Sequence, residues 1–130
     1  METLHAAPAR VFIVEDSASI RERLYEQLRE IDGVSVIGNT DTADSAVEAI
    51  LRTRPDSVIL DIHLFEGNGI DVLREVHVQA PEVMFIVLTN HSNAQYRRAC
   101  LQAGARYFFD KSTEFGKVMQ VIAGLGATRH

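Results

Sequence analysis

The sequence predicts an α/β protein of the flavodoxin-like (βα)5 type, with a five-stranded parallel sheet and helices on both of its faces. Five short apolar runs, each bounded by polar residues, alternate with segments whose apolar residues recur at helical spacing. Alternation of strands and helices in this way gives a parallel sheet with right-handed crossovers. The runs predict strands at about 10–15, 34–38, 57–61, 83–88 and 106–109.

The composition of these runs predicts the order of the strands. The first, third and fourth runs are apolar almost throughout, so we expect them at the centre of the sheet, covered on both faces. The run at 34–38 is more polar, which favours an edge position. Five strands and five helices suit the order 2-1-3-4-5, which places strands 1, 3 and 4 side by side.

The first two helices are expected near 17–31 and 43–53. Their apolar stripes consist of Ile20, Leu24, Leu28 and Ile31 in the first, and Ala43, Ala46, Val47, Ile50 and Leu51 in the second. Ser17 or Ser19 can cap the start of the first helix, and Gly33 is expected as its left-handed terminator. Pro55 is expected to stop the second helix.

The remaining helices are expected near 70–79, 93–103 and 113–124. The stripe of the third helix consists of Ile70, Leu73, Val76 and His77, and that of the fifth of Phe115, Val118, Met119 and Ile122. A turn at Gly67-Asn68-Gly69 leads into the third helix. The fourth helix ends at Gly104 and has the weakest stripe, so its Tyr96, Arg97 and Arg98 form either a solvated face or part of a partner surface.

The composition indicates one soluble domain. A length of 130 residues with 46% hydrophobic content supports a single core, expected at about 9–124, with Gly124 to His130 as a short tail. The net charge of −5 argues against direct nucleic-acid binding. No run approaches the roughly 18 to 20 apolar residues of a membrane span, and Met1 to Arg10 lacks a signal-peptide pattern. Cys100 is expected to be a small packing residue and excludes an internal disulfide, so we expect a cytoplasmic protein.

Polar residues follow four of the predicted strands. Glu15 and Asp16 end the first strand, Asp61 the third and Thr89 the fourth, and Lys111 follows the fifth. Parallel strands bring their carboxyl ends to one rim of the sheet, where open α/β sheets place their sites. Taken singly, an acidic pair is usually a solvated turn, and a lysine in a loop is usually solvated. Their occurrence together at successive strand ends indicates a shared site.

Three carboxylates in one small volume repel one another, and a divalent cation relieves the repulsion. Carboxylate oxygens suit Mg²⁺, and a metal beside Asp61 would neutralise an incoming phosphoryl group. Lys111 offers a second positive charge and Thr89 a hydroxyl donor. Asp61 is therefore the candidate nucleophile, forming an acyl phosphate. The sequence contains no Walker-type loop, zinc-ligand spacing or nucleophile elbow.

Over about residues 9–124 the chain resembles the receiver domain of bacterial two-component response regulators. The resemblance is carried by four stretches, Val11 to Ser17, Val58 to Leu64, Ile86 to Thr89 and Gly104 to Ser112. It implies that Asp61 accepts a phosphoryl group from a histidine kinase or a histidine phosphotransfer protein, with Mg²⁺. The implied metal ligands are Asp16, Asp61 and the backbone carbonyl of His63, with Glu15 acting through water. Thr89 and Lys111 are implied to bind the phosphoryl oxygens, and Phe108 to be the switch aromatic.

Four positions depart from the family's commonest pattern. Glu15 occupies a position of the acidic pair where the family usually has an aspartate, and Phe65 a position where proline is common. Asn90 replaces a small residue, and Ser112 replaces a proline. None of them removes a reacting group, although Asn90 could narrow the access of phosphate. Because the chain ends shortly after the fifth predicted helix, we expect a stand-alone receiver without an output domain, unless that domain was cut away.

The leading function is a phosphorylation-activated signalling switch in a phosphorelay. The protein is not expected to be an enzyme, although it promotes its own phosphotransfer and dephosphorylation. It is expected to bind a protein partner through the fourth helix, the fifth strand and the fifth helix. One alternative is a degenerate receiver used as a constitutive interaction module, against which Asp61, Thr89 and Lys111 argue. Another is a small magnesium-dependent phosphohydrolase, for which the chain leaves no room for a cap.

Two histidines are expected at the mouth of the site. His63 follows Asp61 by two residues, and His91 follows Thr89 by two residues. They are either solvated loop residues or residues that tune how long the phosphoryl group survives, together with Asn90. We expect obstruction of the attacking water, and hence slower hydrolysis.

Overall fold

The computed structural model describes residues 7–127 and confirms the predicted fold class. A single sheet contains five parallel strands in the order β2-β1-β3-β4-β5. The strands are β1 (Ala9–Val14), β2 (Val34–Thr40), β3 (Ser57–Leu60), β4 (Met84–Thr89) and β5 (Tyr107–Asp110). The helices are α1 (Ala18–Arg29), α2 (Ala43–Thr53), α3 (Gly69–Gln79), α4 (Ala94–Ala103) and α5 (Phe115–Ala127). The first residues of the chain and the last three of its tail lie outside the described residues.

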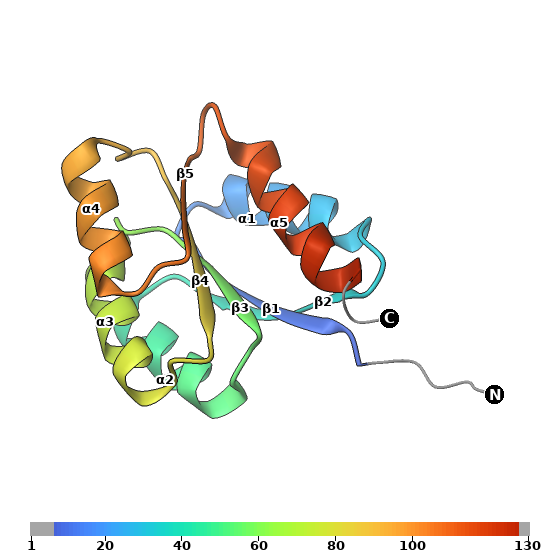
Figure 1. Ribbon diagram of the computed structural model, residues 1–130, viewed down its shortest axis with the longest axis horizontal. Coiled ribbons are helices and arrows are strands. Elements are labelled where there is room, and N and C mark those ends of the chain that lie inside the picture. The colour runs from blue at the N-terminus through green and yellow to red at the C-terminus, as the bar shows by residue number, and fades with distance from the viewer. Residues whose placement is uncertain (1–6, 128–130) are drawn as a thin grey trace.

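Helices cover both faces of the sheet. Figure 1 shows α1 and α5 on one side of it and α2, α3 and α4 on the other. Alternate residues of the inner strands face the two layers, because successive side chains of a strand point to opposite faces. Val11, Ile13 and Ile59 pack in the α1/α5 core, whereas Val58 and Leu60 pack in the α2–α4 core. As predicted, β1, β3 and β4 are central and buried, and the half-buried β2 is an edge.

Four of the helix starts are capped by a side-chain oxygen that accepts a backbone N–H of the first turn. Ser17 caps α1, as predicted, Thr42 caps α2, Asn68 caps α3 and Asn93 caps α4. The helix α2 ends at Thr53, as predicted, and its C-cap residue Arg54 adopts the left-handed conformation with φ 49° just before Pro55. The buried Cys100 is a packing residue of the α2–α4 core, and its burial raises the pKa of the thiol to about 11.

Two helix ends differ from the prediction. The helix α1 ends at Arg29, and Gly33, although left-handed, lies in the turn before β2 rather than at the helix cap. The helix α5 continues through Gly124 to Ala127, so the first part of the expected tail is helical. A Cβ at Gly126 would lie 2.7 Å from the carbonyl oxygen of Asp32. This close approach requires glycine and packs the last turn of α5 against the turn between α1 and β2.

The register of the inner strands brings their carboxyl ends level with one another at one edge of the sheet. Val14 is level with Leu60, and Leu60 is level with Val87. The residues that follow these positions therefore emerge side by side at the carboxyl edge of the sheet. Among the described residues, no helix is long and apolar enough to cross a membrane.

Candidate functional site

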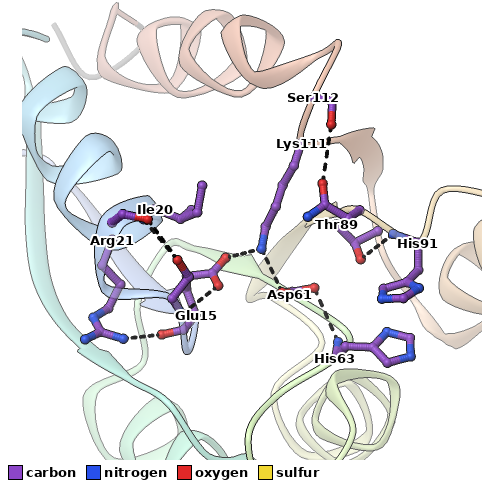
Figure 2. Close-up of polar contacts among 12 residues, drawn as sticks. Glu15, Ile20, Arg21, Asp61, His63, Thr89, His91, Lys111 and Ser112 are labelled. Carbon is purple, nitrogen blue, oxygen red and sulfur yellow. Dashed lines mark hydrogen bonds and ion pairs between the residues drawn. The ribbon is translucent and has the colours of Figure 1, made fainter.

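The predicted acidic cluster forms at the rim. One carboxylate oxygen from each of Glu15, Asp16 and Asp61 lies within 4.8 Å of the others. Glu15 and Asp61 are 2% and 6% exposed, whereas Asp16 is exposed. Figure 2 shows Glu15 and Asp61 pointing toward the same space between the ends of β1 and β3. An oxygen-rich set of this kind suits a hard divalent cation such as Mg²⁺.

Lys111 bridges the two buried carboxylates. Its Nζ lies 2.7 Å from Oε1 of Glu15 and 2.8 Å from Oδ2 of Asp61. Burial alone would lower the pKa of Lys111, but the hydrogen bonds to Asp61 and Glu15 outweigh it and raise the pKa above its usual value. The side chain therefore remains a cation at physiological pH. It reaches the site from the loop after β5, as Figure 2 shows.

The charges of the cluster do not balance. One ammonium faces two buried carboxylates, with the carboxylate of Asp16 beside them. Burial raises the pKa of Glu15, although hydrogen bonds from Lys111 and from the Ser17 N–H act in the opposite direction. A cluster with excess negative charge in a partly desolvated place gains from a bound cation. The donor set and its charge thus both fit a magnesium ion.

The turn before α3 holds the backbone that follows Asp61. The Gly69 N–H donates to the carbonyl of Ile62 at 2.8 Å, and a Cβ at Gly69 would lie 2.2 Å from the carbonyl oxygen of Asp61. Only glycine fits there. The His63 N–H donates to Oδ1 of Asp61 at 3.3 Å, so the loop also orients the carboxylate. The turn itself was predicted from the sequence, but its contact with Asp61 was not.

Thr89 is fully buried at the end of β4. Its Oγ1 accepts a hydrogen bond from the His91 N–H at 3.1 Å, and its carbonyl accepts one from the Lys111 N–H at 3.0 Å. The hydroxyl proton of Thr89 makes no other hydrogen bond to a described residue and is free to be donated. Phe108 is buried at 4% exposure, and the Arg97 guanidinium donates to its carbonyl at 3.2 Å.

The two histidines lie together at the rim. The ring centroids of His63 and His91 are 3.6 Å apart with a tilt of 32°, and both residues are exposed. Tyr96 contacts both rings edge-on, at 5.5 and 6.1 Å. Figure 2 shows the imidazoles facing one another beside Asp61 and Thr89. The structure thus brings both predicted tuning histidines to the site, and adds the contact with Tyr96.

The sequence did not predict a hydrogen bond that joins two loops of the rim. The Ser92 hydroxyl donates to Oδ2 of Asp110 at 2.5 Å, and this bond lowers the pKa of Asp110. The other carboxylate oxygen accepts the N–H groups of Ser112 and Thr113. The loop after Thr89 is thereby joined to the loop that carries Lys111. An aspartate followed by serine and threonine is a readable turn signal, but nothing local indicates its contact with Ser92.

Comparison with known proteins decides the family. The response regulator receiver domain family matches residues 11–123. The chain belongs to this family. Receiver domains are the phosphoacceptor modules of two-component signalling, and this chain has that role.

Relatives and solved structures agree with this assignment. The chain is 40% identical over 101 residues to a protein-glutamate methylesterase/protein-glutamine glutaminase of Rhizobium etli, an alignment that covers 77% of this chain and 29% of that protein. The response regulator domain of Thermotoga maritima CheB is similar with a TM-score of 0.79 and 25% identity, covering 94% of this chain and 96% of that domain. The chain spans between 28% and 58% of the length of its curated relatives.

A further solved receiver carries a metal. The receiver domain of the sensor histidine kinase PA1611 from Pseudomonas aeruginosa has a magnesium ion coordinated in its active-site cleft. Its TM-score is 0.79 at 24% identity, covering 93% of this chain and 99% of that one, so the likeness concerns the fold.

Proposed function

We propose that the protein is a signalling switch that accepts a phosphoryl group on Asp61 from a histidine kinase or a histidine phosphotransfer protein. The observation that carries this proposal is the position of Asp61 at the end of the central strand β3. Its carboxylate lies between the acidic pair that follows β1 and Thr89 at the end of β4, with the Lys111 ammonium 2.8 Å away. Both oxygens of Glu15 are already bound, one by Lys111 and one by the Ser17 N–H.

The reaction forms one bond and breaks one. An oxygen of Asp61 attacks phosphorus, and the bond from phosphorus to the donor's imidazole nitrogen breaks, returning the electron pair to that nitrogen. A bound Mg²⁺ would neutralise charge on the phosphoryl oxygens. We propose that Asp16, Asp61 and the carbonyl of His63 hold it, with Glu15 acting through water. Lys111 then releases its bond to Asp61 and binds a phosphoryl oxygen, and Thr89 donates its hydroxyl proton to another.

The chain alone is proposed to act as a phosphoacceptor and not as an enzyme on a separate substrate. The methylesterase and glutaminase activities belong to the names of longer relatives, of which this chain spans under a third. The lone buried Cys100 favours a reducing compartment and supports a cytoplasmic location.

Phosphorylation by a small donor tests the proposal. The protein is incubated with acetyl phosphate, with and without Mg²⁺, and its intact mass is measured. We expect one added phosphate that hydroxylamine removes and that forms only with the metal. Asp16→Ala should lower magnesium affinity at least about tenfold, or roughly 1.4 kcal/mol, because one carboxylate rarely holds this ion alone. Exposed Asp71 offers a control, since Asp71→Ala should not change the titration. Failure of the parent to take up phosphate would overturn the proposal.

The readout is proposed to run from Thr89 to Phe108. Donation of the Thr89 hydroxyl to the phosphoryl group would pull the loop after β4 toward the site. Phe108 packs in the α2–α4 core at 4% exposure, and its ring carries no hydroxyl that would hold it at the surface, which supports an inward-facing state. NMR shifts of α4 and β5 should therefore change on adding the phosphate mimic BeF₃⁻ to the parent, and should change much less in Thr89→Ala. Equal shift changes in the parent and in Thr89→Ala would contradict a readout that runs through Thr89.

His63 and His91 are proposed to slow loss of the phosphoryl group. Their rings contact one another at 3.6 Å across the mouth, with the edge of Tyr96 against them, and so obstruct the approach of water. His63→Ala or His91→Ala should raise the dephosphorylation rate severalfold between pH 5.5 and 8. Slower decay would instead identify an imidazole that acts as a base. Superimposed curves for parent and variants would show that both histidines are only solvated loop residues.

A further inference from the structure

The strand β2 forms one edge of the sheet, and among the described residues only β1 pairs with it. It lies at the opposite edge from β5 (Figure 1). Its seven residues, Val34–Thr40, include no charged residue and no proline, which are residues that usually protect an edge strand from pairing. A register shift between Val11 and Phe12 interrupts the pairing with β1, but Val34 to Val36 precede it. This stretch is therefore a template for a further strand.

The backbone groups of Val34 and Val36 point away from β1. The Gly33 carbonyl accepts the Ala9 N–H at 2.8 Å, so Gly33 and Ser35 direct their backbone groups toward β1. Because these groups alternate sides along a strand, those of Val34 and Val36 point outward. Both side chains pack, partly buried, in the α1/α5 core. An extended segment laid along this edge can exchange hydrogen bonds with both residues.

A groove lies between this edge and α1. It has a volume of about 230 Å³ and is lined by Tyr25, Leu28, Arg29, Val34 and Val36. Sites for small molecules usually measure about 300–1,000 Å³, so this groove suits one side chain of a longer ligand. The Tyr25 hydroxyl accepts a hydrogen bond from Nδ2 of Asn39 at 2.9 Å, which holds the aromatic ring beside β2 as one wall of the groove.

Arg29 supplies an unpaired positive charge at the groove. Its side chain is exposed, and it forms no ion pair within 4 Å with a described carboxylate. An occupant therefore needs an apolar side chain for the groove and a carboxylate for the guanidinium. Side chains two residues apart in an extended segment share one face, so an apolar residue and an acidic residue at that spacing meet both needs. The β2 strand of a second copy has no carboxylate to offer.

We propose that the β2 edge binds an extended segment of a partner protein as an additional strand, with an apolar side chain in the groove and a carboxylate, two residues away, on Arg29. Addition of a strand to a sheet edge is a common mode of peptide recognition, in which the backbone gives affinity and the side-chain pockets give specificity. The inference goes beyond the proposed function, because the groove shares no lining residue with the phosphorylation site. The edge is an attachment point that does not require phosphorylation.

The experiment uses the full chain and a synthetic strand. The probes are the fluorescein-labelled peptides Gly-Ser-Thr-Leu-Thr-Glu-Thr-Ser-Gly and Gly-Ser-Thr-Glu-Thr-Leu-Thr-Ser-Gly, because an added strand can run in either direction. Binding is measured by anisotropy and located by NMR shifts, which should change in β2 and α1. Arg29→Glu and Tyr25→Ala should each weaken binding of the better probe at least about tenfold. Arg98→Glu, which changes an exposed and unpaired arginine of α4 by the same charge, should leave it unchanged.

Changes in the probe separate strand pairing from attraction between charges. N-methylation of alternate backbone nitrogens removes the N–H donors from one edge of the peptide. Methylation of one alternate set should therefore abolish binding, whereas methylation of the other set should not. Replacing Glu by Gln, or Leu by Ser, should also weaken binding.

Three outcomes overturn the proposal outright. They are equal binding of the probe by Arg29→Glu and the parent, equal binding of both methylated sets, and NMR shifts confined to residues outside β2 and α1. Self-association of the parent that Arg29→Glu abolishes would also overturn it, in favour of a second copy. Phosphate labelling of Arg29→Glu by acetyl phosphate should match the parent, so a failure of strand addition is distinguishable from a failure of the phosphoacceptor function.

Discussion

Asp61→Asn should abolish phosphate uptake while leaving the protein folded. An amide oxygen is a far weaker nucleophile than a carboxylate, so no acyl phosphate forms at this position. The change also removes one of the two buried carboxylates that share the Lys111 ammonium. Because a single cation then faces a single buried anion, we expect the variant to be at least as stable as the parent. Intact mass after incubation with acetyl phosphate and Mg²⁺ measures the first effect, and urea denaturation the second.

The control for this experiment is an exposed aspartate. Asp71 lies on α3 with its side chain in solvent, and Asp71→Asn should take up phosphate as the parent does. If Asp61→Asn still gained one phosphate at the parent's rate, the acceptor would be another rim carboxylate. Peptide mapping after borohydride reduction would identify it, with Asp16 as the first candidate because its side chain is exposed.

Much of this fold was readable because the signals were local and strong. Buried parallel strands appear as apolar runs, and the polar residues that end those runs must meet at one rim once the strand order is right. The positions of Asp61, Thr89 and Lys111 at successive strand ends therefore predict that the three residues share one site. The strand order was predicted because five strands and five helices suit the order 2-1-3-4-5, with the more polar run that forms β2 at an edge.

The failures came from tertiary contacts. The tail was expected to begin at Gly124, but α5 continues to Ala127, and Gly126 in its last turn packs closely against Asp32. The contact of Ser92 with Asp110 depends on how two loops approach each other, which no periodicity encodes. The ion pair between Lys111 and Glu15 was not predicted either. Adjacent residues at a strand end point in opposite directions, so one carboxylate is buried against Lys111 and the other is exposed.

Lys111→Met should reduce phosphate uptake at least about a hundredfold and strongly destabilise the protein. The ammonium is a preorganised cation at the position where phosphoryl charge arrives, and removing such a group typically costs two to three orders of magnitude in rate. Its removal also leaves Glu15 and Asp61 buried without a counterion. Breaking a buried ion pair from one side costs about 3–5 kcal/mol of unfolding free energy. Urea denaturation with chelator present measures this loss.

Two further variants separate charge from packing. Lys117 pairs with a partly exposed Glu114 at the surface, so Lys117→Met should change stability by no more than about 0.5 kcal/mol. Adding Glu15→Gln to Lys111→Met removes one of the uncompensated charges and should restore much of the lost stability. Mg²⁺ should restabilise the single variant in the same way. No recovery in either case would assign the loss to packing of the lysine stem.

The stability of Lys111→Met should also depend on pH, which provides an independent test of the electrostatic role of Lys111. Burial raises the pKa of Glu15 above its usual value, so the folded state binds that proton more tightly than the unfolded state does. The contribution of protonated Glu15 is complete below about pH 4.5 and is lost as pH rises through the folded pKa. Lys111 opposes that loss in the parent, and its own pKa is raised, so it stays charged well above neutrality. The stability deficit of Lys111→Met should therefore be smallest near pH 5 and grow toward pH 8. A deficit that stayed constant between these values would contradict an electrostatic role for Lys111.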